Sequence, residues 1–172
     1  MITHFDNFLD TETFTELNQY MLSKKIHVVE NQNQAVTAFF RYKVEGNDLI
    51  TLLPIIDQIQ KCLKNVTKST TQQHYASWFQ YMNNKQRAGK HFDGMVNNRY
   101  LTRSYSAFLY THAIWEDDYG GELCTNETET KVYPNRLIIY SRDEEHWTNP
   151  ILHDQDKYKR MFFATSWSVD YE

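Results

Sequence analysis

The chain has 172 residues, of which 41% are hydrophobic and 15% aromatic, and this composition excludes a disordered protein and suffices for one globular core. Its formal net charge of -4, without any polybasic run, argues against a nucleic-acid-binding surface. Two cysteines are too few for a disulfide scaffold, and no apolar run could span a bilayer, so we expect a cytoplasmic protein that binds neither nucleic acid nor membrane.

The first seventy residues predict two helices with short strands before and between them. Asp10 and Thr11 are favourable N-cap residues for the first helix. Leucine and isoleucine recur at helical spacing from Leu49 to Leu63 in the second helix, a pattern that predicts packing against a sheet. The predicted elements are a strand over residues 4–9, a helix over 11–23, a hairpin or two strands within 26–45, and a helix that starts at 46–48.

From about residue 72 the hydrophobic pattern changes to a period of two, which is typical of strands. Helices followed by strands predict an α+β, mainly β fold, namely a double-stranded β-helix (jelly roll) with supporting N-terminal helices. We expect a single domain over residues 1–172, with a helical support region over 1–70 and a jelly-roll core over 71–172. The predicted strands are residues 74–82, 101–111, 131–133, 136–140 and 161–169.

His91 and Asp93 stand two residues apart within this β-rich half of the chain. On a strand, both side chains would project from the same face and converge on one point. With a later histidine they would form a 2-His-1-carboxylate site, which leaves open positions on Fe(II) for a co-substrate and O2. Because the chain has seven histidines, this spacing alone is a weak indication, and the third ligand has to come from other motifs.

Several motifs follow this pair in a specific order. Gly120-Gly-Glu-Leu123 precedes the apolar run Leu137-Ile-Ile-Tyr140, which leads to His146, and Arg160 opens a final aromatic-rich run. In order and spacing, these motifs resemble the Fe(II)- and 2-oxoglutarate-dependent dioxygenases of the prolyl-hydroxylase-like branch, over about residues 75–170. The resemblance implies an oxygenase that uses Fe(II), 2-oxoglutarate and O2, and it admits ascorbate as a further cofactor.

The resemblance also implies roles for individual residues. Arg160 would hold the distal carboxylate of 2-oxoglutarate, since its planar guanidinium can bind a buried carboxylate through two hydrogen bonds. Tyr110 would hydrogen-bond the same carboxylate, and Tyr81, ten residues before His91, would line the pocket. The implied metal ligands, which are also the catalytic residues, are His91, Asp93 and His146.

The distal histidine has a competitor in His153. His146 lies fourteen residues before Arg160 and His153 lies seven before it, whereas members of the family usually have about ten, so the spacing does not decide between them. Pro150, four residues after His146, matches the family pattern and favours His146.

Asp93 favours hydroxylation, because relatives that halogenate carry a small residue at this position. The branch suggests a prolyl residue of a peptide or protein as the substrate, while a small molecule remains open, as does a monomer or a homodimer. The main alternative is a non-catalytic, metal-binding jelly-roll sensor or binding domain. A hydrolase or isomerase of the related cupin shape is disfavoured, because such sites use more histidines and need no arginine like Arg160.

Overall fold

The computed structural model describes residues 2–29, 39–83, 88–93, 103–152 and 159–170. Within these ranges the chain forms helices and strands in an order close to the predicted one. They are β1 (Ile2–Phe5), α1 (Thr11–Leu22), β2 (His27–Val29), β3 (Phe39–Val44), α2 (Asn47–Thr67), β4 (Gln72–Met82), β5 (Arg103–Tyr110), β6 (Leu123–Thr125), β7 (Glu129–Thr130), β8 (Leu137–Ser141), β9 (His146–Thr148) and β10 (Arg160–Val169).

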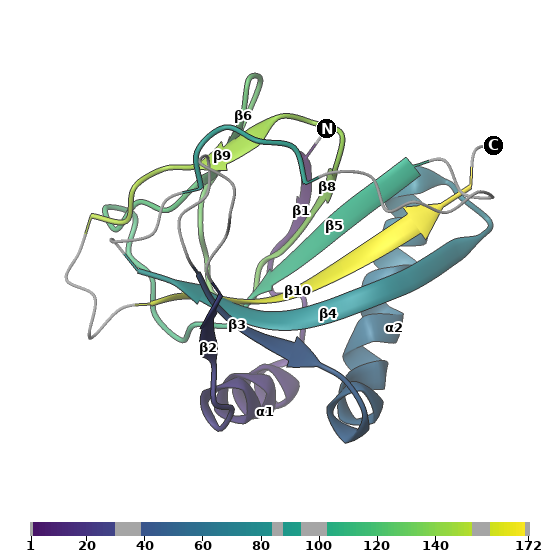
Figure 1. Cartoon of the computed structure of the whole chain (residues 1–172), viewed down its shortest axis with the longest axis horizontal. Coiled ribbons are helices and arrows are strands. Elements are labelled where there is room, and N and C mark those ends of the chain that lie inside the picture. Colours follow the sequence, from purple (N-terminus) through teal and green to yellow (C-terminus); the bar gives the residue numbers. More distant parts are fainter. Residues whose placement is uncertain (1, 30–38, 84–87, 94–102, 153–158, 171–172) are drawn as a thin grey trace.

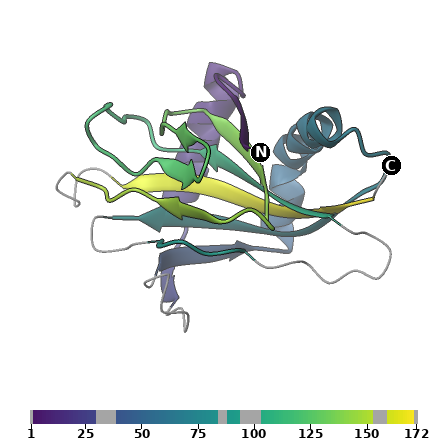
Figure 2. The same ribbon diagram turned by 90° about the horizontal axis from the view of Figure 1, so that it is seen from above.

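The strands form two antiparallel sheets. The larger has the order β1-β8-β5-β10-β4-β3-β2, and the smaller has the order β7-β6-β9. Both helices lie on one side of the larger sheet, and β6 and β9 lie on the opposite side (Figure 1). The view from above shows β10 running through the middle of the molecule (Figure 2). The architecture is a jelly roll with two supporting helices, as the pattern of helices followed by strands predicted.

The two faces of the larger sheet belong to different hydrophobic cores. On one face, α1 and α2 pack their buried residues, including Met21, Ile59 and Leu63, against Phe79 and Phe163 of the sheet. On the other face, a second cluster lies between the sheets and includes Tyr110, Leu123 and Phe162. The candidate site lies on this second face of the larger sheet, where the smaller sheet covers it.

The predicted helices are present, and their ends follow from the sequence. Asp10 is the N-cap of α1, and its Oδ1 accepts a hydrogen bond of 2.9 Å from the backbone N–H of Thr13. Gly46 precedes α2 with a φ of 58°, a left-handed conformation that glycine adopts without steric cost. Neither helix of the described part of the chain is long and apolar enough to cross a membrane.

Two predictions about the strands were wrong, and two short strands were not predicted. Residues 131–133 are not a strand, because the pairing with β6 takes place one step earlier, at β7. β6 and β9 were not predicted, since three-residue strands carry little periodicity of their own. His91 lies in an isolated bridge rather than in a longer strand.

Candidate active site

His91 and His146 lie side by side because their backbones pair. Each donates its N–H to the carbonyl oxygen of the other, at 3.0 Å in both directions, in a single antiparallel bridge. Residues paired in this way project their side chains to the same side of the ladder, and the two imidazole rings are 4.4 Å apart between centroids. The bridge thus brings a histidine of β9 next to a segment more than fifty residues earlier in the chain.

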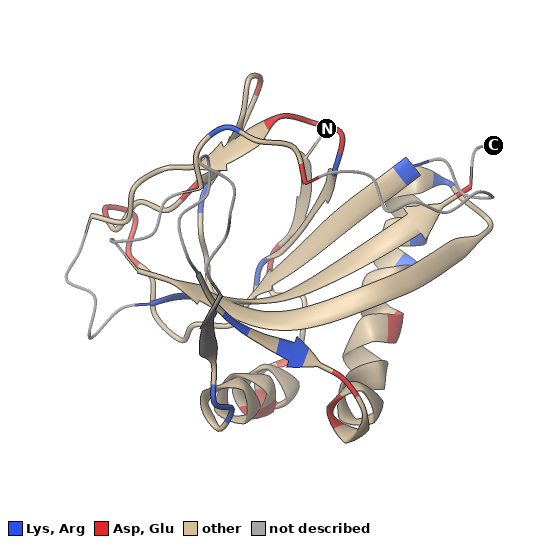
Figure 3. Cartoon of the chain, viewed as in Figure 1, with Lys and Arg blue, Asp and Glu red and all other residues tan. Residues whose placement is uncertain are grey.

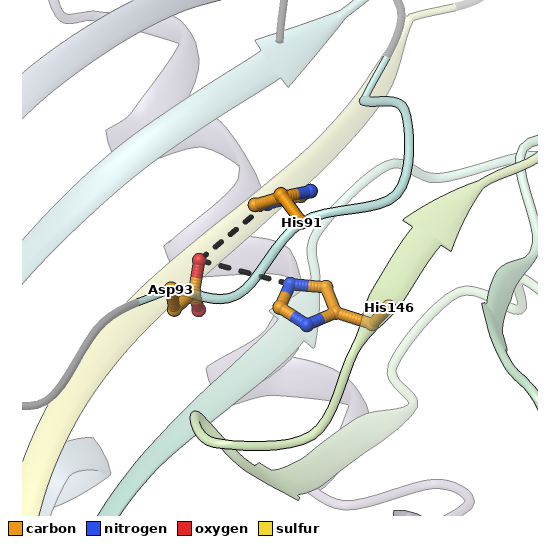
Figure 4. A group of neighbouring side chains, drawn as sticks. All are labelled: His91, Asp93 and His146. Atoms are coloured by element: carbon orange, nitrogen blue, oxygen red, sulfur yellow. Dashed lines mark ion pairs between the residues drawn. The ribbon is translucent and has the colours of Figure 1, made fainter. Parts of the chain in front are cut away.

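Asp93 completes a cluster with the two histidines (Figure 4). Its Oδ1 lies 3.6 Å from Nε2 of His91 and 3.7 Å from Nε2 of His146. One donor atom from each of the three side chains lies within 4.8 Å of the others. Two imidazole nitrogens and one carboxylate oxygen therefore face the same point, as the 2-His-1-carboxylate arrangement requires.

Backbone carbonyls set the orientation of both imidazole rings. Nδ1 of His91 lies 2.6 Å from the carbonyl oxygen of Gly89, and Nδ1 of His146 lies 2.9 Å from that of Glu144. Because a carbonyl oxygen can only accept, each Nδ1 must carry the proton. The neutral form of each ring then keeps a lone pair on Nε2, directed toward Asp93, which is the tautomer that binds a metal.

The second carboxylate oxygen of Asp93 is held by hydroxyl groups. Tyr140 donates to Oδ2 at 2.7 Å and Ser106 donates to it at 3.0 Å. Arg142 supports the same segment, since its Nη2 donates to the backbone oxygen of Asp93 at 2.7 Å and its Nη1 to Oγ of Ser106 at 3.1 Å. With Oδ2 engaged in this way, Oδ1 is left facing the two histidines.

These contacts govern the charge states in the cluster. Burial alone would raise the pKa of Asp93, but hydrogen bonds from His146 and His91, which require a proton on Nε2 in the absence of a metal, and the charge of Arg142 hold it well below its usual value. Burial, followed by the charge of Asp93, raises the pKa of Tyr140 well above its usual range. The carboxylate is therefore ionised, while the phenol keeps the proton that it donates to the carboxylate.

The cluster lines a cavity of about 290 Å³ between the two sheets. Arg160 lines the same cavity and is almost completely buried. Its Nη2 donates to the hydroxyl of Tyr110 at 2.7 Å, and its Nε has no hydrogen-bond partner within the described part of the chain. A buried cation of this kind needs an anionic partner, and the cavity in front of it has room for one.

The glycine pair of Gly120 and Gly121 lets the chain pass close to this cavity. Both residues have positive φ values, of 71° and 81°. A Cβ on Gly120 would lie 2.2 Å from the carbonyl oxygen of Pro150, and one on Gly121 would lie 3.3 Å from Cδ of Arg160. Any larger residue would push away either the segment that follows His146 or the arginine itself.

The residues of the site fit Fe(II) and 2-oxoglutarate. The donor set of two imidazoles and one carboxylate is one that Fe(II) accepts with coordination positions to spare. Nε of Arg160, which has no hydrogen-bond partner in the described part of the chain, can donate to a carboxylate in the cavity that Arg160 lines. Tyr110, which the sequence singled out for the same carboxylate, accepts a hydrogen bond from Arg160 but is fully buried and is not among the residues that line the cavity.

The structure does not bring every residue singled out from the sequence to this cavity. Tyr81 stacks on Phe40 and contacts the core beneath the helices, while its neighbours Gln80 and Met82 line the cavity. The cause is the alternation of side chains along β4, which turns Tyr81 to the opposite face. His153 lies outside the described residues.

Sequence reasoning missed the residues that surround the cluster. Tyr140 and Ser106 are direct partners in the pairing of β8 with β5, which brings their hydroxyl groups together at Asp93. A signal existed for Ser106, because it shares the face of its strand with Tyr110. Arg41 also lines the cavity. It could have been singled out from the sequence, because it is a charged residue between two aromatic residues of a predicted strand.

Known structures resemble the chain over nearly its whole length. A prolyl-4-hydroxylase from Pseudomonas putida is 14% identical, with a TM-score of 0.70 over 99% of this chain and 92% of the other. The viral collagen prolyl hydroxylase of Paramecium bursaria Chlorella virus-1, solved as a 2-oxoglutarate complex, is 14% identical, with a TM-score of 0.70 over 98% and 96%.

An enzyme with a different activity has the same fold. The non-heme α-ketoglutarate-dependent epimerase SnoN from nogalamycin biosynthesis is 10% identical, with a TM-score of 0.72 over 98% of this chain and 78% of the other. At such identities the likeness shows the fold alone.

The sequence comparisons identify the family more directly. No curated protein matches the chain significantly. The model of the 2OG-Fe(II) oxygenase superfamily matches residues 76–168, a segment that contains the three clustered side chains and Arg160. This match covers more than half of the sequence, and the chain therefore belongs to the 2OG-Fe(II) oxygenase superfamily, a family of dioxygenases that use Fe(II), 2-oxoglutarate and O2.

Proposed function

We propose that the chain is a hydroxylase that acts on a prolyl residue of a peptide or protein and holds Fe(II) with His91, Asp93 and His146. The observation that carries the proposal is the convergence of their three donor atoms in a cavity that Arg160 also lines. When bound, Fe(II) and 2-oxoglutarate supply the activation of O2 that hydroxylation of a carbon atom requires. The task of the protein residues is to bind, orient and enclose the reactants.

Arg160 and Tyr110 are the proposed binding site for the distal carboxylate of 2-oxoglutarate. The guanidinium is packed on the rings of Tyr110 and Phe162, at 5.2 and 5.3 Å from their centroids, so its position is fixed before the co-substrate arrives. Burial strengthens the attraction between a guanidinium and a carboxylate, because little water competes for either group.

Tyr140 and Ser106 are proposed to orient the carboxylate ligand. By donating to Oδ2 of Asp93 they leave Oδ1 for the metal, so that Asp93 would bind through one oxygen. A carboxylate that binds through one oxygen occupies one coordination position, and more positions stay open for the co-substrate and O2.

A prolyl substrate is supported by two of the similar structures and by one exposed ring beside the proposed metal ligands. Phe92, between the two ligands of the His-x-Asp pair, is 59% exposed, although it is not among the residues that line the cavity. An exposed aromatic ring next to the proposed metal site suits a pyrrolidine ring that packs on it from solvent. Two of the similar structures are prolyl hydroxylases, whereas the epimerase shows that the fold also serves another reaction.

Anaerobic titration with Fe(II) and 2-oxoglutarate tests the metal site, because a chelated 2-oxo acid produces a weak visible charge-transfer band. We expect the band in the parent protein and in His153→Ala, and its loss in His91→Ala and in His146→Ala. Arg160→Gln should weaken 2-oxoglutarate binding by roughly tenfold or more, since a charge-assisted hydrogen bond is lost. A band that survives in His146→Ala but not in His153→Ala would assign the distal ligand to His153.

The substrate is tested separately with a proline-rich peptide under air. We expect the peptide to stimulate succinate formation from 2-oxoglutarate and to gain one oxygen atom, located by mass spectrometry on a prolyl residue. Oxygen found on another residue type, or on a small molecule only, would overturn the prolyl assignment while leaving the oxygenase assignment in place.

A further inference from the structure

The described residues that line the cavity carry more positive charge than the metal and co-substrate require. Besides Arg160 it is lined by Arg41 and Arg142, and among the described residues that line it, Asp93 is the only carboxylate. A divalent metal and the 2-oxoglutarate dianion cancel each other, so the three guanidinium groups still face one carboxylate once both are bound. A cavity of this sign attracts and retains an anionic ligand.

Arg41 reaches the cavity from the sheet edge formed by β3 and β2. In the pairing of β3 with β4 it lies opposite Gln80, which also lines the cavity, while the adjacent Phe40 stacks on Tyr81 on the other face. β3 contains two basic residues, Arg41 and Lys43, whereas its neighbour β4 contains no lysine, arginine, aspartate or glutamate (Figure 3). The alternation of the strand therefore directs the guanidinium of Arg41 inward.

Two neighbours position this guanidinium. It lies over the indole ring of Trp78, 5.0 Å from the centroid, and its Nε and Nη2 both donate to Oε1 of Gln80 at 3.3 Å. The ring and the amide fix the plane of the guanidinium without changing its charge. This geometry is suited to a planar anion that binds at the edge of the guanidinium.

Arg41 and Arg142 influence each other across the cavity. Burial lowers the pKa of Arg41, the charge of Asp93 raises it, and the charge of Arg142 lowers it further. Arg142 itself donates to the hydroxyl of Ser166 at 2.8 Å and to the backbone oxygen of Asp93 at 2.7 Å. Two positive charges in a partly dehydrated cavity repel each other, and an anion placed beside them would relieve the repulsion.

We infer, on the basis of the metal site and the oxygenase activity in the proposed function, that the substrate carries a carboxylate near the carbon atom that is oxidised, and that Arg41, stacked on Trp78, binds this carboxylate. Arg160 would bind the co-substrate at one end of the cavity, and Arg41 would select the substrate at the edge of β3. The α-carboxylate of a free amino acid and the side chain of an acidic residue in a peptide offer the same chemistry.

A matched pair of probes tests the binding of a carboxylate. 4-Fluorobenzoate and 4-fluorobenzamide have the same shape and differ in charge. With protein loaded with Mn(II) and 2-oxoglutarate, we expect the paramagnetic ion to broaden the fluorine resonance of the benzoate roughly tenfold more than that of the benzamide. Equal broadening of the two probes would overturn the inference.

Variants on one strand assign this preference to Arg41. Arg41→Gln should abolish the preference for benzoate, and Arg41→Lys should retain part of it, because the charge remains while the planar fork is lost. Lys43→Gln is the matched control, since it removes a positive charge from the same strand at an exposed side chain that pairs with Glu45. A preference that is unchanged in Arg41→Gln, or lost equally in Lys43→Gln, would overturn the inference.

Co-substrate binding separates this inference from the proposed function. We expect the affinity for 2-oxoglutarate to fall in Arg160→Gln and to be unchanged in Arg41→Gln. If Arg41→Gln weakens 2-oxoglutarate binding as strongly as Arg160→Gln, Arg41 serves the co-substrate and the inference is wrong. If the parent protein binds no 2-oxoglutarate, the proposed function fails, and saturation-transfer NMR with the two fluorinated probes on metal-free protein still tests Arg41.

Turnover distinguishes the two sources of the carboxylate. Faster decarboxylation of 2-oxoglutarate with L-proline than with L-prolinamide would indicate a free amino acid. A higher rate with the capped peptide acetyl-Pro-Glu-amide than with acetyl-Pro-Gln-amide would indicate an acidic residue in a peptide. Equal rates within both pairs would overturn the inference.

Discussion

Strand β10 has two faces with different surroundings. On one face its residues join the core beneath α1 and α2, and on the other they line the cavity of the candidate site. Neighbouring residues can therefore have unlike roles, as Phe163 packs on Phe79 while Phe162 borders the cavity. The core residues are Met161, Phe163, Trp167 and Val169, and the cavity residues are Arg160, Phe162, Ala164 and Ser166.

Different forces stabilise the two sides of the larger sheet. The helix-covered face is stabilised by burial of apolar side chains, which needs volume and shape but few directional contacts. The cavity face buries guanidinium, hydroxyl and carboxylate groups, each of which needs a partner. Substitutions on the helix side should therefore change stability alone, and substitutions on the cavity side should change binding.

Truncation of Leu63 should have the largest effect on the helix side. Leu63 is fully buried between α2 and the sheet, so Leu63→Ala should lower the free energy of unfolding by about 2–5 kcal/mol, through lost transfer energy and the cavity left behind. Urea unfolding measures the loss, and Mn(II) and 2-oxoglutarate affinities of the folded variant should be unchanged.

Leu53→Ala on the same helix is the matched control for Leu63→Ala. Its side chain is 45% exposed, so its truncation should cost less than about 1 kcal/mol. Equal losses for the two variants would contradict the assignment of one face of α2 to the core. A change in metal affinity in Leu63→Ala would contradict the claim that substitutions on the helix side change stability alone.

Acid should destabilise the protein through His112, on the cavity side. Burial, with a smaller contribution from the charge of Arg160, lowers the pKa of His112 to about 3, although the backbone oxygen of Met161 opposes the shift. In the unfolded protein this histidine has its ordinary pKa of 6.5, so below that pH the unfolded state binds more protons. His112 should then cost about 2 kcal/mol of stability between pH 7.5 and pH 5.

The pH dependence of urea unfolding measures this loss in the parent and in His112→Asn, which replaces the imidazole with a polar side chain that does not titrate. We expect a flatter profile between pH 7.5 and pH 5 in the variant than in the parent. Profiles of equal slope would show that acid acts through other groups.

The division of the chain into helices and strands could be read from the sequence because periodicity is local. The leucine stripe of α2 and the alternation within β4 are visible within ten to twenty residues. β6 and β9 were not predicted, because strands of three residues are stabilised by their partners rather than by a local pattern. His146 in β9, for example, pairs with Thr125 of β6.

The same limit explains what sequence reasoning found and missed in the candidate site. The order of motifs singled out His91, Asp93 and His146, whose donor atoms the structure brings together. The contacts of Asp93 with Ser106 and Tyr140 depend on the register of β5 against β8, which no local pattern reveals. For Tyr81, the spacing to His91 suggested the pocket, whereas its place in the alternation of β4 turns it away.

Removal of the Tyr140 hydroxyl tests whether a hydrogen bond on the cavity side contributes to metal binding. Tyr140→Phe keeps the ring but deletes a donor to Oδ2 of Asp93, so the carboxylate should be oriented less well and Mn(II) affinity should fall about tenfold. Tyr105→Phe is the control, because Tyr105 packs against the helix-side core. Isothermal titration calorimetry measures both affinities, and equal affinities in the two variants would mean that the Tyr140 hydroxyl does not position Asp93.

Asp48 is the counterpart of Asp93 on the helix side, and its loss should have the smallest effect. Tyr20 donates to Oδ1 of Asp48, Tyr42 donates to Oδ2, and Lys24 pairs with Oδ1 at 2.7 Å, which joins α1, β3 and α2. Hydrogen bonds from Lys24, Tyr20 and Tyr42 lower the pKa of Asp48 to about 2. Its contribution to stability is thus complete above pH 3.8 and is lost as the pH falls toward 2.

Asp48→Asn should cost about 1 kcal/mol at pH 7, because the cluster is partly exposed and water screens its charges. Asp57→Asn, an exposed position on α2, is the control and should change the free energy of unfolding by less than about 0.5 kcal/mol. Metal affinity should stay the same in both variants, since neither residue faces the cavity. A loss of metal affinity in Asp48→Asn would mean that the contact of Tyr42 with Asp48 affects the cavity side of the sheet through β3.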